Sequence, residues 1–189
     1  MIIIDRTKRK RVNWVDSSLK SKAYKGQLKD EEYYLTLAKH NFLWRYIVTR
    51  YPKEATSPLC VLGYSAIPIA IELSQWTYPV TYITDTHEGI VKAKKDCEIQ
   101  AGFFKDFYYF DFGKNCPPSR IISFIGLLDQ LPADELNDYL DLLLRRCREI
   151  VCAVPNDRDW RSLLKDQYRL TMKEYPEKDW ILLCIKENE

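Results

Sequence analysis

Short apolar runs alternate with amphipathic stretches along most of the chain. The apolar runs predict strands at residues 59–62, 80–83, 107–110, 121–125 and 149–154. Apolar side chains spaced by three and four predict helices at residues 29–51, 66–75, 86–101, 132–147 and 157–166. Strands this apolar are typical of sheets that are covered on both faces. The alternation therefore predicts an α/β fold with a doubly wound, mostly parallel sheet.

Two further strands are expected at the C-terminal end, at residues 168–175 and 180–185. Only a short connection that contains Pro176 separates them, and no helix fits between them. Neighbouring strands joined this closely pair antiparallel as a hairpin. The sequence thus predicts a seven-stranded sheet that is mostly parallel and ends in an antiparallel pair.

Length and composition favour one globular domain. The chain has 189 residues, of which 46% are hydrophobic and 30% charged. That is enough for one sizeable core and too little for two. No apolar run is long enough for a membrane-spanning helix, and the first residues do not resemble a secretory signal. We therefore expect a cytoplasmic protein without a membrane partner.

Charge is distributed unevenly, which suggests a division into a basic arm at residues 1–29 and a domain at residues 30–189. The arm has nine basic and two acidic residues, a charge of +7 within a chain of net charge +2. Such an arm could bind nucleic acid by releasing counterions from phosphates. A solvated segment that only aids solubility is the alternative interpretation.

The cysteines and histidines of the sequence do not indicate a metal site or a histidine-based catalytic site. The six cysteines include no CxxC pair, and no group of residues has the spacing of metal ligands, so we expect no metal site. Cys60, Cys152 and Cys184 fall inside predicted strands, where cysteine acts as a small buried apolar residue. With His40 and His87 as the only histidines, a histidine-based catalytic triad is not expected.

The order of elements, with a helix ahead of the first strand, resembles the class I S-adenosylmethionine-dependent methyltransferase family over residues 30–187. Local stretches resemble it too: residues 69–73 and 80–85 match the first helix and the second strand, and residues 121–132 match the fourth strand with its leucine-rich turn. The resemblance implies a methyltransferase-like Rossmann fold and a methyl-transferring enzyme that uses S-adenosylmethionine, with an acceptor still to be identified.

Open α/β sheets bind ligands beyond the carboxyl ends of their strands. At the end of the first strand, Gly63, Tyr64 and Ser65 would let the backbone approach the ligand beside a helix N-terminus, which favours a carboxylate. Asp85 follows the second strand and could accept hydrogen bonds from ribose hydroxyls. All of these are candidate cofactor-binding residues; each is also an ordinary turn or cap residue.

Two further pairs complete the candidate site. Asp111 and Phe112, after the third strand, would supply an acceptor and an apolar wall for adenine. Asp129 and Gln130, after the fourth strand, lie where a transferred group would sit and are the candidate catalytic residues. The alternative is that Asp129 and Gln130 only shape the entry to the next helix.

The first loop departs from the family's usual acid-x-Gly-x-Gly-x-Gly pattern. If Gly63 is the first glycine, Val61 replaces the acid, and Ser65 and Ile67 replace the later glycines. Three alternatives follow. One is a catalytically inactive methyltransferase-like scaffold that binds protein or nucleic acid. Another is an aminopropyl transferase of the nicotianamine synthase type, because residues 61–69 resemble the first loop of those enzymes. A nicotinamide-dependent oxidoreductase is least favoured, because its GxGxxG motif is missing.

Overall fold

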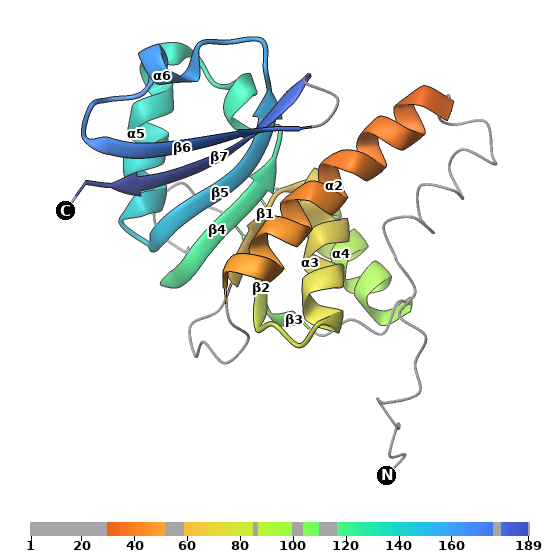
Figure 1. The fold of residues 1–189 in the computed structure, drawn as a ribbon. Helices are drawn as coiled ribbons and strands as arrows, with labels where there is room; N and C mark the ends of the chain where they lie inside the picture. The colour runs from red at the N-terminus through yellow and green to blue at the C-terminus, as the bar shows by residue number, and fades with distance from the viewer. Residues whose placement is uncertain are drawn as a thin grey trace.

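The computed structural model describes residues 30–51, 59–84, 87–99, 104–109, 117–175 and 179–188 (Figure 1). Its centre is a seven-stranded sheet in the order β3-β2-β1-β4-β5-β7-β6. The strands are β1 (Leu59–Leu62), β2 (Val80–Thr84), β3 (Phe104–Tyr109), β4 (Ser119–Ile125), β5 (Cys147–Pro155), β6 (Tyr168–Glu174) and β7 (Trp180–Glu187). β1 to β5 pair in parallel, and β7 pairs antiparallel with both β5 and β6. The predicted mostly parallel sheet with a terminal hairpin is confirmed.

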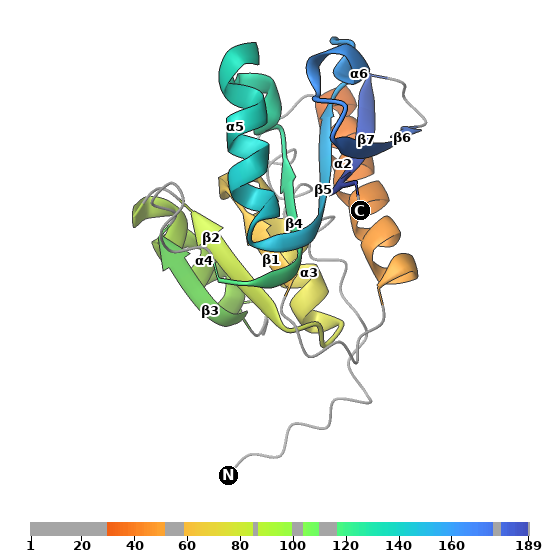
Figure 2. The ribbon, with the colours of Figure 1, turned by 90° about the vertical axis from the view of Figure 1, so that its left-hand side faces the viewer.

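Helices cover both faces of this sheet (Figures 1 and 2). One face carries α2 (Asp30–Arg50) and α3 (Ile67–Gln75), and α4 (His87–Ile99) packs beside α3 over β2 and β3. The other face carries α5 (Ala133–Leu144) and the short α6 (Trp160–Leu163). The single-turn helices η1 (Tyr64–Ala66) and η2 (Leu128–Gln130) follow β1 and β4.

Two hydrophobic cores result, one on each face of the sheet. In the four-residue strand β1 every side chain is buried, and successive side chains alternate between the two cores. α5 shows how a helix completes one of them. Pro132 precedes it, acids occupy its first turn, and Leu136, Leu140 and Leu143 are buried against the sheet. Each such leucine contributes about 1.5–3 kcal/mol relative to an exposed position.

Several predicted boundaries differ from the structure by a few residues, and three of the elements differ clearly. The helix expected over residues 132–147 ends at Leu144, because the chain turns at Arg145 and enters β5 at Cys147. β3 begins at Phe104 and not at residue 107, since edge strands admit the polar residues that precede Phe107. The helix expected over residues 157–166 is the four-residue α6.

Cys60, Cys147, Cys152 and Cys184 are buried and are not in disulfide bonds, which confirms the interpretation of Cys60, Cys152 and Cys184 as core residues. Burial raises the pKa of the Cys152 thiol well above its ordinary value, so this side chain stays neutral. Among the described residues, none of the helices has the length and apolar character needed to cross a membrane.

Candidate functional site

The carboxyl ends of the central parallel strands meet at one edge of the sheet. Leu62 is the register partner of Ile83, and the Gly63 amide donates to the Ile83 carbonyl at 2.9 Å. Across β4 and β5, the Gly126 amide donates to the Ala153 carbonyl at 2.9 Å. The turns after β1 and β4 therefore begin side by side at the edge where doubly wound folds bind ligands.

Gly63 gives the turn after β1 its shape. Its φ of +91° lies in a region that side-chain-bearing residues rarely adopt, so glycine is required here. Among the described residues other than its two chain neighbours, a Cβ added to Gly63 would meet no atom within 4 Å. The backbone at Gly63 is thus open to a ligand immediately before η1 and the N-terminus of α3, whose unsatisfied amides favour negative charge.

Neighbouring residues hold this turn in place. The Ser65 hydroxyl donates to the Ile125 carbonyl at the end of β4 (3.1 Å), and His40 of α2 hydrogen-bonds the Ser65 carbonyl through Nε2 (3.1 Å). Ile67, at 1% exposure, packs into the hydrophobic core. Ser65 thus links the β1 and β4 turns, and the Ile67 side chain, which stands where the family has a glycine, is buried in the core.

Asp129 lies in η2, after β4, on the same edge. The turn begins at Gly126, whose φ is +64°, and the Gln130 amide side chain donates to the Gly126 carbonyl at 2.8 Å. Oδ1 of Asp129 is buried and has no hydrogen-bond partner among the described residues. Burial raises the pKa of Asp129, an effect that a backbone hydrogen bond and the nearby Arg158 charge only partly offset. A desolvated carboxylate with an unused oxygen is suited to accept a proton or hydrogen bond from a ligand.

Two residues that the sequence did not predict as part of the site, Arg158 and Trp180, complete this part of the edge. Arg158, in the loop after β5, donates to the carbonyl oxygens of Asp129 (2.6 Å) and Leu131 (3.5 Å) and lies 5.9 Å from the centre of the Trp160 ring system. Trp180 of β7 lies beside Gly126, 3.6 Å from where a Cβ would be. The available signal for Arg158 was its position after a strand end on the ligand edge.

The other predicted residues are only partly described. The backbone of Tyr64 forms η1, but its side chain lies outside the description. β2 and β3 end at Thr84 and Tyr109, which are register partners. Asp85, Asp111 and Phe112 follow these strand ends in the sequence and lie outside the described residues, so their ligand roles stay predictions.

No protein-family model and no curated protein matches this chain. Solved structures do match its fold. A magnesium protoporphyrin IX methyltransferase from Synechocystis with bound S-adenosylhomocysteine has a TM-score of 0.66 at 11% identity, over 93% of this chain and 97% of that one. The N-methyltransferase NodS from Bradyrhizobium japonicum, also with S-adenosylhomocysteine, has a TM-score of 0.63 at 15% identity, over 93% and 99%. An rRNA methylase from Escherichia coli has a TM-score of 0.58 at 13% identity, over 94% and 77%.

The chain therefore has the class I methyltransferase fold, as its sequence predicted. Identities of 11–15% establish the architecture and leave the chemistry to be argued from the residues at the site.

Proposed function

We propose that the protein is an S-adenosylmethionine-dependent methyltransferase. The observation that carries the proposal is the open backbone turn at Gly63, which leads into η1 and α3 at the ligand edge of the sheet. A Cβ-free turn lets a ligand contact main-chain atoms directly, and the adjacent helix N-terminus favours the carboxylate of a methionine moiety. The solved structures with the same fold include enzymes that contain S-adenosylmethionine or S-adenosylhomocysteine.

In this proposal the predicted residues bind different parts of the cofactor. Gly63, Tyr64 and Ser65 form the turn beside the methionine moiety, and Asp85 accepts hydrogen bonds from the ribose hydroxyls. Asp111 and Phe112 hold the adenine, through a hydrogen bond and apolar contact. The sulfonium ligand supplies an already activated methyl group, so the protein must mainly align donor and acceptor and exclude water.

In this arrangement Asp129 acts as the general base for the methyl acceptor. Its buried Oδ1, which has no hydrogen-bond partner in the part of the chain that the structure describes, lies in the turn after β4, and its raised pKa brings the carboxyl closer to the pH at which a general base works well. Arg158 fixes the backbone of this turn through the carbonyl of Asp129, and acts as a positioning residue. Trp180 bounds the same region beside Gly126.

Calorimetric titration of the full chain with S-adenosylhomocysteine tests the proposal. We expect stoichiometric binding that weakens at least about tenfold in Asp85→Asn, because a charged hydrogen bond to ribose is lost. Asp138→Asn, an exposed change on α5 with the same loss of charge, is the matched control and should bind as the unmodified chain does. Equal affinity of both variants would remove Asp85 from the site.

The alternative functions predict different results in the same assays. A catalytically inactive scaffold would bind neither S-adenosylmethionine nor S-adenosylhomocysteine at millimolar concentrations. An aminopropyl transferase would bind the cofactor but release methylthioadenosine, whereas methyl transfer leaves S-adenosylhomocysteine. Product analysis by mass spectrometry therefore separates the two enzymes.

A further inference from the structure

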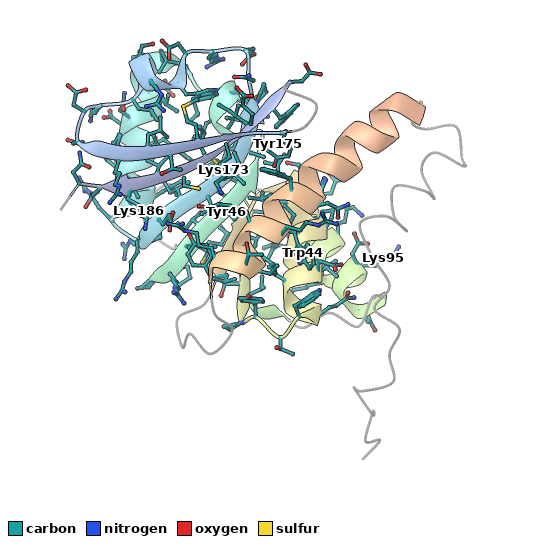
Figure 3. The ribbon with its side chains drawn as sticks, viewed as in Figure 1. Trp44, Tyr46, Lys95, Lys173, Tyr175 and Lys186 are labelled. Atoms are coloured by element: carbon teal, nitrogen blue, oxygen red, sulfur yellow. The ribbon has the colours of Figure 1, made fainter. Side chains whose placement is uncertain are left out.

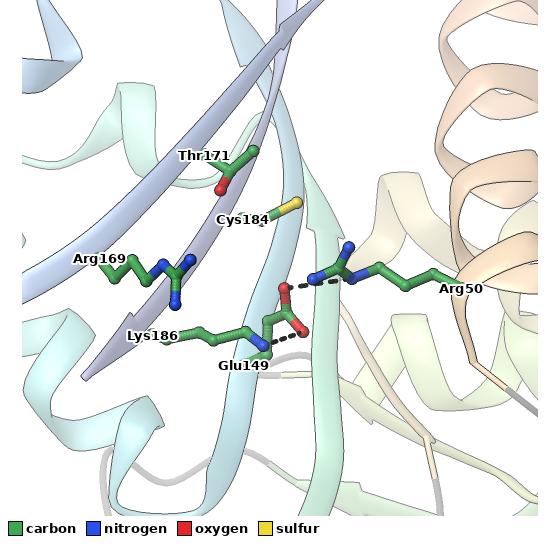
Figure 4. Close-up of a pocket in the computed structure, with 6 residues that line it drawn as sticks. All are labelled: Arg50, Glu149, Arg169, Thr171, Cys184 and Lys186. Atoms are coloured by element: carbon green, nitrogen blue, oxygen red, sulfur yellow. Dashed lines mark ion pairs between the residues drawn. The ribbon is translucent and has the colours of Figure 1, made fainter. Parts of the chain in front are cut away.

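A pocket of about 100 Å³ lies between α2 and the C-terminal hairpin (Figure 4). It is lined by Arg50, Glu149, Arg169, Thr171, Cys184 and Lys186. Glu149 stands near the start of β5, six residues before Pro155 at the ligand edge. At about 3.3 Å per residue, the two ends of this strand are separated by about 20 Å. The pocket is therefore distinct from the candidate methyl-transfer site.

Cations outnumber acids in this pocket. The single carboxylate, Glu149, is 3% exposed and accepts a hydrogen bond from the Tyr51 hydroxyl. Its other contacts are ion pairs with Lys186 (3.3 Å) and Arg50 (3.9 Å). Arg169 lines the same pocket and forms no ion pair with any residue that the structure describes. Among the described residues that line the pocket, three positive side chains thus face one carboxylate, a net charge of +2.

The neighbouring titratable groups do not offset this charge. Burial raises the pKa of the Cys184 thiol to about 11, and burial also raises the pKa values of the Tyr46 and Tyr51 hydroxyls. All three are neutral at pH 7. Lys173 on β6 lies over the Tyr46 ring, 5.0 Å from its centre, and adds positive charge beside the pocket (Figure 3).

We propose that this pocket binds a phosphate group, either inorganic phosphate or a terminal phosphomonoester. Such a group carries a charge of about −1.5 to −2 at pH 7, which matches the pocket. The Arg169 guanidinium can donate two parallel hydrogen bonds to phosphate oxygens, and Lys186 and Thr171 can donate others. A volume of about 100 Å³ is large enough for a tetrahedral oxyanion.

The matched variants are Arg169→Gln and Arg145→Gln. Arg169 is exposed on the edge strand β6, so its replacement leaves the core intact. Arg145 is an exposed arginine at the end of α5, on the opposite side of the sheet, and its replacement changes the net charge equally. Inorganic phosphate is titrated calorimetrically into the full chain and both variants at constant ionic strength, and thermal unfolding is followed in parallel.

We expect phosphate to bind the unmodified chain and Arg145→Gln equally, and Arg169→Gln at least about tenfold more weakly. Binding should strengthen between pH 5 and pH 7.5, as phosphate loses its second proton near pH 6. Absence of binding at millimolar phosphate, or an equal weakening in the two variants, would overturn the proposal. Neither result bears on S-adenosylhomocysteine binding at the other edge.

A second titration distinguishes the sources of the phosphate. A short oligothymidylate with a 5′-phosphate is compared with the same strand bearing a 5′-hydroxyl. If an Arg169-dependent preference for the 5′-phosphorylated strand is found, the pocket takes terminal phosphomonoesters as well as the free ion. Arg169-dependent binding that is equal for both strands would overturn the assignment to a phosphomonoester and indicate a backbone phosphodiester.

Discussion

The guanidinium of Arg158 donates a hydrogen bond to the backbone carbonyl of Asp129 at 2.6 Å, and so joins the loop after β5 to the turn after β4. This contact holds the turn that carries the candidate catalytic carboxylate. Because the acceptor is a backbone atom, the contact depends on the identity of residue 158 and not on the side chain of residue 129.

Replacement of Arg158 by glutamine should loosen this turn. We expect a loss of about 1–2 kcal/mol in the free energy of unfolding and faster amide exchange at Gln130 and Leu131, whose amides close η2. Urea denaturation measures the free energy of unfolding, and hydrogen exchange measures the protection of the two amides. Arg161→Gln, an exposed change in α6, is the control. If both variants exchange alike, Arg158 does not position the turn.

Asp129→Asn should be at least as stable as the unmodified chain at pH 7. Burial raises the pKa of Asp129 in the folded protein, so folding disfavours the charged form. This penalty is absent below the unfolded carboxyl pKa of about 3.9 and grows as the pH rises through the folded pKa. Thermal unfolding of both proteins from pH 3 to pH 8 should show their difference shrinking toward acid. A variant that is less stable at every pH contradicts this expectation.

Gly63→Ala should destabilise the fold, although the added methyl group meets no atom within 4 Å in the described part of the chain beyond its neighbours. The φ of +91° costs a side-chain-bearing residue about 1–2 kcal/mol. Chemical denaturation gives the loss directly. Ser65→Ala, which removes one hydrogen bond and keeps the backbone unstrained, should cost about 0.5–1.5 kcal/mol. A neutral effect at Gly63 would mean that the turn relaxes to another conformation.

Acidification should weaken the contact between α5 and β6 through Asp141. Partial burial pushes the pKa of this carboxyl upward, but hydrogen bonds from Tyr168 and Lys165 outweigh it and lower the pKa overall. The stability that Asp141 contributes is therefore complete above the unfolded carboxyl pKa of about 3.9 and is lost as the pH falls through the folded value. Asp141→Asn should lower the melting temperature at pH 7 and have little effect near pH 2. A constant difference at all pH values would exclude the ionic contribution.

Replacing Lys8, Arg9, Lys10 and Arg11 by glutamine tests the predicted basic arm. If residues 1–29 bind nucleic acid, the slope of log affinity against log salt should fall by about 3–4 for duplex DNA, one phosphate contact per charge removed. Fluorescence anisotropy with labelled RNA and DNA measures this slope. An unchanged slope and affinity would support the interpretation of the arm as a solvated segment.

The parts of the fold that follow from burial were predictable. The all-apolar run of β1 correctly predicted a strand that is buried on both faces, and the short connection after β6 correctly predicted the hairpin. The helix over residues 132–147 was extended too far because Cys147 fits the helical pattern as well as it fits the start of β5. Apolar spacing alone does not show where a helix turns into a strand.

The candidate site was predictable only where it depends on strand ends. The turns at Gly63 and Asp129 come together because parallel strands end at one edge. The contact of Arg158 with a backbone carbonyl leaves no pattern in the sequence, since any residue offers that acceptor. Glu149 did leave a signal, as a single acid at the start of a buried run, but its partners on α2 and β7 are distant in sequence.

The exposed margin of β6 has a consequence for self-assembly. Arg169, Thr171 and Lys173 alternate along this outermost strand with residues that pack toward α5. If two molecules joined their sheets antiparallel about Thr171, Arg169 of each would stand opposite Lys173 of the other, and like charges would meet twice. This electrostatic repulsion disfavours a sheet that continues from one molecule into the next, so β6 remains the last strand of the sheet.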